Sequence, residues 1–172
     1  KDGMGYSDAV GCPVFSQAAV TAIDAPFYEP LIEDGQTVGF SFIQDFRSDQ
    51  WPRPCNYYYR QRFDFYADGR LRPVAASFGR GCGDDGTSRP VTRVEFADMT
   101  RVSSVADGTW KAWPGEDWKL AANLPAAPDK SKLRFENASG AAISVTPNGG
   151  GWEKSRGDNP YVYVTLHPPG RD

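Results

Sequence analysis

The chain is poor in the side chains that most often transfer protons or bind metals. Its 172 residues contain a single histidine, His167, and three cysteines, Cys12, Cys55 and Cys82. Mechanisms that need a histidine base, and metal sites built from several histidines, therefore have little material. The cysteines lack the paired spacing of a structural zinc site and are too few for a disulfide scaffold. We expect His167 to be an exposed residue without a catalytic role.

Long apolar runs are also missing. No stretch approaches the roughly 20 apolar residues of a membrane-spanning helix, and no signal-peptide pattern starts at Lys1. We therefore expect no membrane span, and we expect a mature or trimmed product. The net charge is −3, and the arginines between Arg47 and Arg101 are mixed with acidic residues. Because phosphate binding usually requires a denser basic stripe, we expect no nucleic-acid partner.

The familiar motifs of nucleotide and acyl chemistry are absent as well. The sequence has no phosphate loop, no dinucleotide fingerprint and no nucleophile elbow. The acidic pairs Asp84-Asp85 and Glu116-Asp117 indicate solvated turns, because hard cations need several oxygen ligands from spaced positions. We expect no metal and no cofactor.

The most informative stretch that is present covers residues 55–78. An Asp68-Gly69 pair separates two runs of alternating strand-like residues. Such a pair is typical of a two-residue hairpin turn, in which both central residues adopt positive φ. The pattern therefore predicts a hairpin in which Phe65 lies opposite Arg72.

This register gives the hairpin two different faces. Tyr57 lies on a face that is largely aromatic and apolar, which is typical of a core face. Tyr58 lies on the other face together with Arg60, Arg62 and Asp64, and this face is expected to be the wetter one.

The same register predicts a disulfide. It places Tyr59 opposite Phe78 and Cys55 opposite Cys82, where a separation of about 5.5 Å between α-carbons permits the bond. A bulge at the neighbouring glycines would shift this pairing by one residue. The Cys55 to Cys82 bond would leave Cys12 over and would indicate an oxidising, extracytoplasmic compartment.

The remaining pattern predicts a chain of short strands. With 14 prolines and 18 glycines, the sequence is interrupted every several residues, which leaves room for few long helices. Residues 1–30 are expected to be irregular and residues 45–54 to form a loop. Outside the hairpin, strands are expected over residues 37–46, 89–96, 133–135, 141–146 and 161–166. We predict an all-β fold, an antiparallel β-sandwich that forms a single domain over residues 1–172.

Three tryptophans allow two interpretations. Trp110, Trp113 and Trp118 lie in a polar segment that contains glycine and proline, and we expect a loop with short strands. Exposed indoles would be stacking platforms for sugar rings, whereas buried indoles would be core residues. The exposure of the three side chains separates these interpretations.

The tyrosine hairpin also resembles a known family. The resemblance is to the catalytic-domain hairpin of copper amine oxidases, where Asn-Tyr-Asp-Tyr leads into an aromatic strand and an Asn-Gly turn. It is carried by Asn56-Tyr57-Tyr58-Tyr59, Phe63, Phe65, Tyr66, Asp68 and Gly69. In that family the motif tyrosine is oxidised to the quinone cofactor, and Tyr57 occupies the matching position. Further along, Arg93-Val94-Glu95 is similar to a motif that follows the copper ligands, and residues 161–165 resemble a later strand.

The sequence departs from the family pattern at the residues that form the quinone cofactor and bind copper. Two defining positions of the cofactor motif are changed in the segment Arg53-Pro54-Cys55-Asn56-Tyr57-Tyr58. The paired copper histidines of the family align with Gly86-Thr87-Ser88. The third copper ligand would lie beyond Asp172, so the domain is expected to be incomplete at its C-terminus. Without copper, nothing drives the oxidation of the tyrosine. We therefore expect Tyr57 to be an unmodified core residue.

Three functions follow as expectations. The first is a non-catalytic amine-oxidase-like β domain, secreted, periplasmic or on the cell surface, that acts as a structural or protein-interaction module. The family dimerises through this domain, and open sheet edges would favour pairing with a protein partner or a second copy. The second is a carbohydrate-binding β-sandwich, and the third is a residual copper and quinone amine oxidase.

Overall fold

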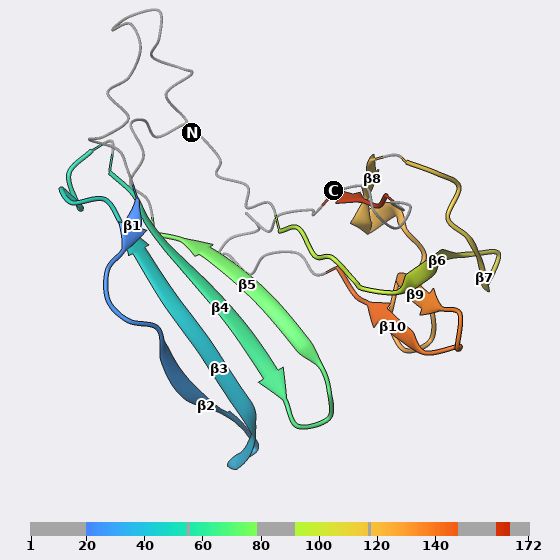
Figure 1. The fold of residues 1–172 in the computed structure, drawn as a ribbon, viewed down its shortest axis with the longest axis horizontal. Coiled ribbons are helices and arrows are strands. Elements are labelled where there is room, and N and C mark those ends of the chain that lie inside the picture. Colours follow the sequence, from blue (N-terminus) through green and yellow to red (C-terminus); the bar gives the residue numbers. More distant parts are fainter. Residues whose placement is uncertain (1–19, 55, 79–91, 117, 148–160, 166–172) are drawn as a thin grey trace, which may run out of the picture. The chain divides into compact units, whose positions relative to one another are not determined.

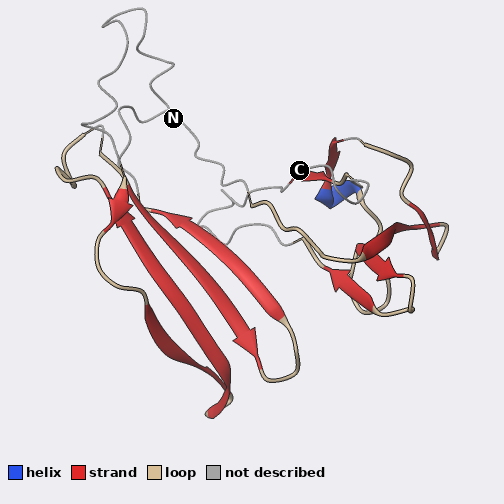
Figure 2. Cartoon of the chain, viewed as in Figure 1, coloured by secondary structure: helices blue, strands red, loops and turns tan. Residues whose placement is uncertain are grey.

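The computed structural model describes residues 20–54, 56–78, 92–116, 118–147 and 161–165 (Figure 1). Strands make up nearly all of the regular secondary structure in this part of the chain, and every strand pair in it is antiparallel (Figure 2). The all-β prediction is confirmed. Contacts divide the chain into two compact units, Lys1–Val91 and Thr92–Asp172, and each is described by itself. The single sandwich over residues 1–172 stays a prediction.

The first unit is one antiparallel sheet built around a long central strand. The strands run in the order β1, β3, β4, β5, and β2 also pairs with β3. Their bounds are Thr21–Ala22 for β1, Phe27–Glu33 for β2, Gln36–Arg47 for β3, Tyr58–Tyr66 for β4 and Leu71–Ser77 for β5. The predicted strand over residues 37–46 is thus confirmed as β3.

Two Asp-Gly pairs form two-residue hairpin turns. Asp34 and Gly35 connect β2 to β3 with φ of 51° and 77°. Asp107 and Gly108 connect two further strands with φ of 50° and 71°. Positive φ at both central positions is the geometry that a two-residue hairpin turn requires, because its twist matches that of the flanking strands.

The predicted two-residue turn at Asp68-Gly69 is wrong. Tyr66 and Arg70 close a three-residue loop, since the Tyr66 N–H donates to the Arg70 carbonyl at 2.9 Å. Gly69 alone has positive φ, 90°, as in a type I turn followed by a bulge. The Asp68 carboxylate accepts the Arg70 N–H at 3.0 Å, which favours this longer loop.

The loop shifts the hairpin register by one residue. Phe65 lies opposite Leu71 and Tyr59 lies opposite Ser77, in place of the predicted partners Arg72 and Phe78. This shift also removes the direct alignment on which the Cys55 to Cys82 disulfide was predicted. All three cysteines lie outside the described residues, so the disulfide stays a prediction.

Strand β2 corrects the prediction that residues 1–30 are irregular. Pro30 interrupts its sequence, and a proline cannot donate a hydrogen bond to a neighbouring strand. An edge strand tolerates this, because one side of its backbone has no partner strand. Pro30 lies opposite Phe40 in the ladder with β3, which is the one strand that pairs with β2 among the described residues.

The second unit contains a four-stranded and a two-stranded sheet. The larger sheet has the order β10, β9, β6, β7, and the smaller one pairs β11 with β8. Their bounds are Met99–Ala106 for β6, Thr109–Ala112 for β7, Trp118–Leu120 for β8, Leu133–Asn137 for β9, Ala142–Val145 for β10 and Tyr161–Tyr163 for β11, with a 3₁₀ turn at Ala121–Asn123. Val102, Leu133 and Val164 form its core.

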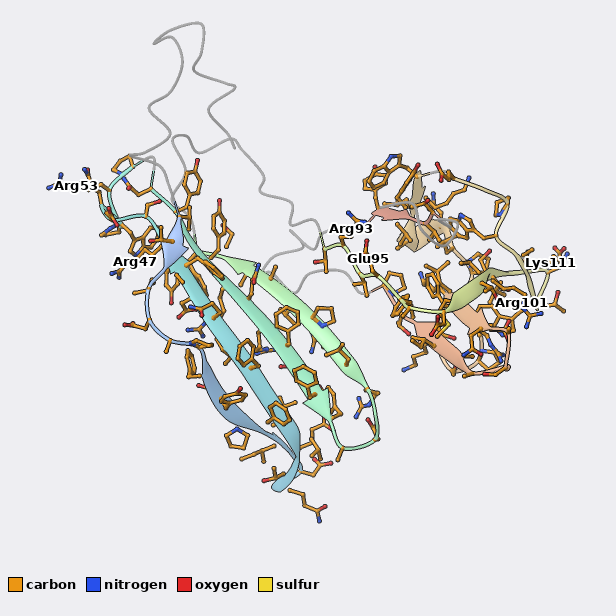
Figure 3. The ribbon with its side chains drawn as sticks, viewed as in Figure 1. Arg47, Arg53, Arg93, Glu95, Arg101 and Lys111 are labelled. Atoms are coloured by element: carbon orange, nitrogen blue, oxygen red, sulfur yellow. The ribbon has the colours of Figure 1, made fainter. Side chains whose placement is uncertain are left out.

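Strand predictions in this unit have mixed outcomes. The strands near residues 133–135, 141–146 and 161–166 are confirmed. The strand over residues 89–96 is wrong for its described part: residues 92–96 are extended chain, where Arg93 forms an ion pair with Glu95 (Figure 3). Strand β6 was missed because its buried valines, Val102 and Val105, are three residues apart and break the alternation of a half-buried strand.

Gly39 is required where β3 meets β4. A Cβ at this position would overlap the Phe65 carbonyl oxygen and lie 2.9 Å from the Tyr66 α-carbon. We expect Gly39→Ala to destabilise the protein by about 1–3 kcal/mol, because the two central strands must separate. Urea unfolding monitored by circular dichroism measures this cost. Thr37→Ala, an exposed position on the same strand, is the control, and equal stability of both variants would contradict the predicted clash.

Candidate functional site

Charge is distributed unequally between the two faces of the five-stranded sheet. All charged side chains of β3, β4 and β5 belong to one face, as the register shows. They are Asp45, Arg47, Arg60, Arg62, Asp64 and Arg72. We call this the charged face, and we call the opposite face of the same strands the uncharged face.

The uncharged face is covered by aromatic rings. Phe40 lies opposite Phe65, and their rings stack at 5.1 Å with 19° between the planes. Tyr28 of β2 packs against Phe40 and Phe42, at 5.9 Å and 5.3 Å between ring centroids. Phe40 and Phe65 nevertheless remain 44% and 40% exposed, and Tyr28 is 67% exposed. The structure confirms that one face of the hairpin is aromatic, but the exposed rings show that most of this face is not buried in a core.

Burial is deepest on the charged face, against expectation. Asp64 is 1% exposed, and Ile43 and Ser41 on the neighbouring strand are also buried. The Ser41 hydroxyl donates to the Asp64 carboxylate at 2.7 Å, and the Arg62 guanidinium donates to it at 3.2 Å. A buried carboxylate needs such partners, because its desolvation is costly. The face of Tyr58, Arg60, Arg62 and Asp64, which was predicted to be the more solvent-exposed one, is therefore polar but partly buried.

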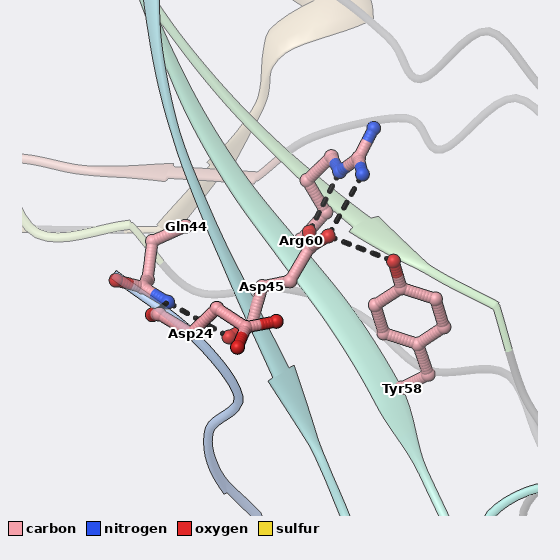
Figure 4. Close-up of polar contacts among 5 residues, drawn as sticks. All are labelled: Asp24, Gln44, Asp45, Tyr58 and Arg60. Atoms are coloured by element: carbon pink, nitrogen blue, oxygen red, sulfur yellow. Dashed lines mark hydrogen bonds and ion pairs between the residues drawn. The ribbon is translucent and has the colours of Figure 1, made fainter. Parts of the chain in front are cut away.

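A second ion pair lies near the end of the charged face (Figure 4). Arg60 donates two hydrogen bonds to Asp45, at 2.7 Å and 2.8 Å, and the Tyr58 hydroxyl donates a third at 2.8 Å. The Arg60 guanidinium also lies 5.8 Å from the Phe27 ring centroid and 6.0 Å from that of Phe78. The pair thus joins β3 to β4 and is held between aromatic rings.

These contacts shift the pKa values of Asp45, Tyr58 and Arg60, that of Arg60 upward through its hydrogen bonds to Asp45. The Arg60 guanidinium, through its hydrogen bonds, lowers the pKa of the Asp45 carboxyl below its usual value, although burial opposes this shift. Donation to Asp45 raises the pKa of the Tyr58 hydroxyl, with burial acting in the same direction. Both shifts favour an ionised Asp45 and a protonated Tyr58 near neutral pH. The hydrogen bonds of the cluster connect β3 to β4.

Tyr57, the residue at the family's cofactor position, is part of the sheet's packing. Its side chain is 4% exposed and its ring stacks on that of Tyr59 at 5.7 Å with 12° between the planes. Its N–H donates to the Ser48 hydroxyl at 3.2 Å, and its carbonyl accepts the Ser48 N–H at 2.9 Å. This placement fits the expected core residue, and its unmodified state stays a prediction.

The described residues do not fit a copper site. Among them, no group of three or more histidine, cysteine, aspartate or glutamate side chains is arranged to hold a metal ion. His167, the aligned Gly86-Thr87-Ser88 segment and the pair Asp84-Asp85 lie outside the described residues. In the part that is described, no helix is long and apolar enough to cross a membrane.

The three tryptophans do not form one site. Trp113 packs against the core of the second unit, so the core interpretation holds for it. Trp110, in β7, is partly buried and lies opposite Val105. Trp118 is 61% exposed, and its ring packs against that of Tyr163 at 4.8 Å. The sequence analysis named all three indoles without distinguishing Trp118 from the others. It missed the tyrosines beside Trp118, whose alternation along β11 was the available signal.

No family model matches this chain, no curated protein matches it and no solved structure matches it. The resemblance to copper amine oxidases therefore has no support from known relatives. Exposed aromatic residues on each of the two units are the features that bear on function.

The Asp45 cluster predicts a pH-dependent stability. Because the folded pKa of Asp45 is lowered, its contribution is present above the unfolded value of about 3.9 and is lost as pH falls through the folded value. Because the folded pKa of Tyr58 is raised, its contribution is lost as pH rises beyond about 10. We expect Asp45→Asn to cost about 1–2 kcal/mol of unfolding free energy at pH 7 and markedly less near pH 2.

Urea titrations of the wild type and the variant at both pH values measure this difference. Tyr58→Phe is the matched comparison, since it removes one of the three hydrogen bonds and leaves the ion pair. A cost of Asp45→Asn that does not change with pH would contradict the assignment.

Proposed function

We propose that this protein is a non-catalytic β module that associates with a second copy of itself through the uncharged face of its five-stranded sheet. One observation carries the proposal: every charged side chain of the three main strands lies on the opposite face, yet Phe40 and Phe65 of the uncharged face, and Tyr28 beside them on β2, remain exposed. Extended exposed apolar surface is typical of interaction sites. Aromatic residues are also enriched in protein interfaces.

The face is a better contact surface than the sheet edges. Edge strand β2 contains Pro30 with Glu29 beside it, and edge strand β5 contains Pro73 with Arg72 beside it. Prolines and charges on edge strands hinder the addition of a further strand. The expected pairing through open edges is therefore disfavoured in this unit, and we propose contact through the face instead.

A second copy suits this face for reasons of charge. A partner surface that carried charges would have to desolvate them against uncharged rings, which is unfavourable. Two copies of the uncharged face avoid this cost, because β3, β4 and β5 bring no charge to the contact. A two-fold symmetric contact of identical patches is also the commonest form of self-association.

An extracytoplasmic location is part of this proposal. Its support is the pair Cys55 and Cys82, which precede and follow the hairpin in the sequence and whose disulfide stays a prediction, together with the resemblance to a family domain that dimerises. The resemblance contributes no catalytic step here, because the described residues offer no copper site. The oxidase alternative would require a quinone absorption band or bound copper in the native protein.

Self-association predicts a specific sensitivity to charge. We expect the wild type to be a dimer by light scattering and Phe40→Glu to be a monomer, because the new carboxylate would be buried without a partner. Arg47→Glu on the charged face is the control and should remain dimeric. The proposal would be refuted if the wild type were a monomer and Phe40→Glu strongly lowered its thermal stability. These results would show that the face is covered within one chain.

The compartment is tested by the cysteines. When protein from its natural source is denatured without a reductant, we expect only one of the three thiols, that of Cys12, to react with a maleimide. After reduction we expect all three to react. Intact mass spectrometry counts the added groups. Three reactive thiols before reduction would contradict the disulfide and remove the support for an oxidising compartment.

A further inference from the structure

Strand β11 carries two tyrosines whose exposure is imposed by the packing of the same strand. Val164 is buried in the core of the second unit, and Val162 packs against that core. Side chains alternate between the two sides of a strand, so Tyr161 and Tyr163 must lie on the side away from the core. They are 59% and 42% exposed.

The neighbouring strand extends this aromatic surface. Trp118 of β8 lies directly opposite Tyr163, and its own side chain is 61% exposed. The two rings are in contact, with 4.8 Å between centroids and 36° between planes. The Tyr163 hydroxyl donates to the Glu116 carboxylate at 3.0 Å, which fixes the tyrosine ring and holds a carboxylate at its rim. We call Trp118, Tyr161, Tyr163 and Glu116 the aromatic platform.

We propose that the aromatic platform binds a neutral oligosaccharide, with the apolar faces of its sugar rings stacked on Trp118 and Tyr163. Amphipathic aromatic side chains offer a sugar both an apolar ring face and a polar partner. Glu116, which lies beside Tyr163, provides a carboxylate, the type of acceptor to which sugar hydroxyl groups donate. The site lies within the second unit and is independent of the proposed self-association.

The ring geometry favours a sugar over a cation. Exposed aromatic rings beside a carboxylate would also suit a quaternary ammonium group, which binds best when several rings surround it. Trp118 and Tyr163 touch one another, so no space for an ammonium group lies between them. Trp118 is nevertheless 61% exposed with Tyr163 packed against it, which leaves the rest of the indole to a flat ligand. Tyr161, two residues along the strand from Tyr163 and thus about 6.6 Å away, provides for a second sugar unit.

Calorimetric titration of the full chain with cellohexaose, xylohexaose and chitohexaose tests the proposal. We expect at least one of them to bind and to change the tryptophan emission. Trp118→Ala should weaken that binding by about tenfold or more, and Trp118→Phe should retain most of it, because the stacking ring is kept. Ile143→Ala, which removes an exposed apolar side chain elsewhere in the unit, should bind as the wild type does.

Several outcomes would overturn the proposal. They are the absence of binding for all three hexasaccharides at millimolar concentration, or binding that Trp118→Ala does not change while the variant keeps its fold by circular dichroism. Binding of a trimethyllysine peptide, lost in Trp118→Ala and with no sugar binding, would assign the platform to cations instead. The oligomeric state of Trp118→Ala should equal that of the wild type, so failure here is distinguishable from failure of self-association.

Discussion

The first unit depends on keeping every charge of its central strands on one face of the sheet. Side chains alternate along a strand, so a slip of β4 by one residue against β3 would move three charges onto the aromatic face. Arg60 would then lie among phenylalanines without Asp45, and the Arg62–Asp64 pair would lose the Ser41 hydroxyl that donates to it across the strands. In the observed register Asp45 lies opposite Arg60 and Ser41 lies opposite Asp64, so each carboxylate has a donor across the strand pair. The charge pattern therefore favours this register between β3 and β4 over a shifted one.

This constraint also explains why burial is greater on the charged face. Long side chains cover that face, and the Arg60 guanidinium lies over the Phe27 and Phe78 rings. An arginine can cover apolar surface with its stem while its head forms an ion pair. The uncharged face has no such covering side chains in its own strands. Its rings pack against one another and leave their outer surfaces exposed, which is why association through that face is the function best supported.

Sequence reasoning recovered the class of the fold and the central hairpin because these depend on local signals. Proline and glycine spacing excluded long helices, and alternation identified β3 and β4. Register depended on the choice between two loop types that share the Asp-Gly signature, and at Asp68 the carboxylate bonds to the Arg70 N–H and favours the longer loop. That choice involves the side chain and backbone together, which a dipeptide pattern does not specify. Edge strand β2 was hidden for a similar reason, since a proline excludes a central strand but not an edge strand.

The two units use exposed aromatic residues in different ways, and the difference follows from what lies beneath them. On the five-stranded sheet, rings line several adjacent strands and form a broad surface without charge, which suits another protein surface of the same kind. On the pair β8 and β11, only a few rings are exposed, and Glu116 lies at their edge. The valines that alternate with the tyrosines anchor that strand to the core. A narrow platform with a carboxylate at its rim has too little apolar area for a stable protein interface, so a small polar ligand with an apolar face fits it better.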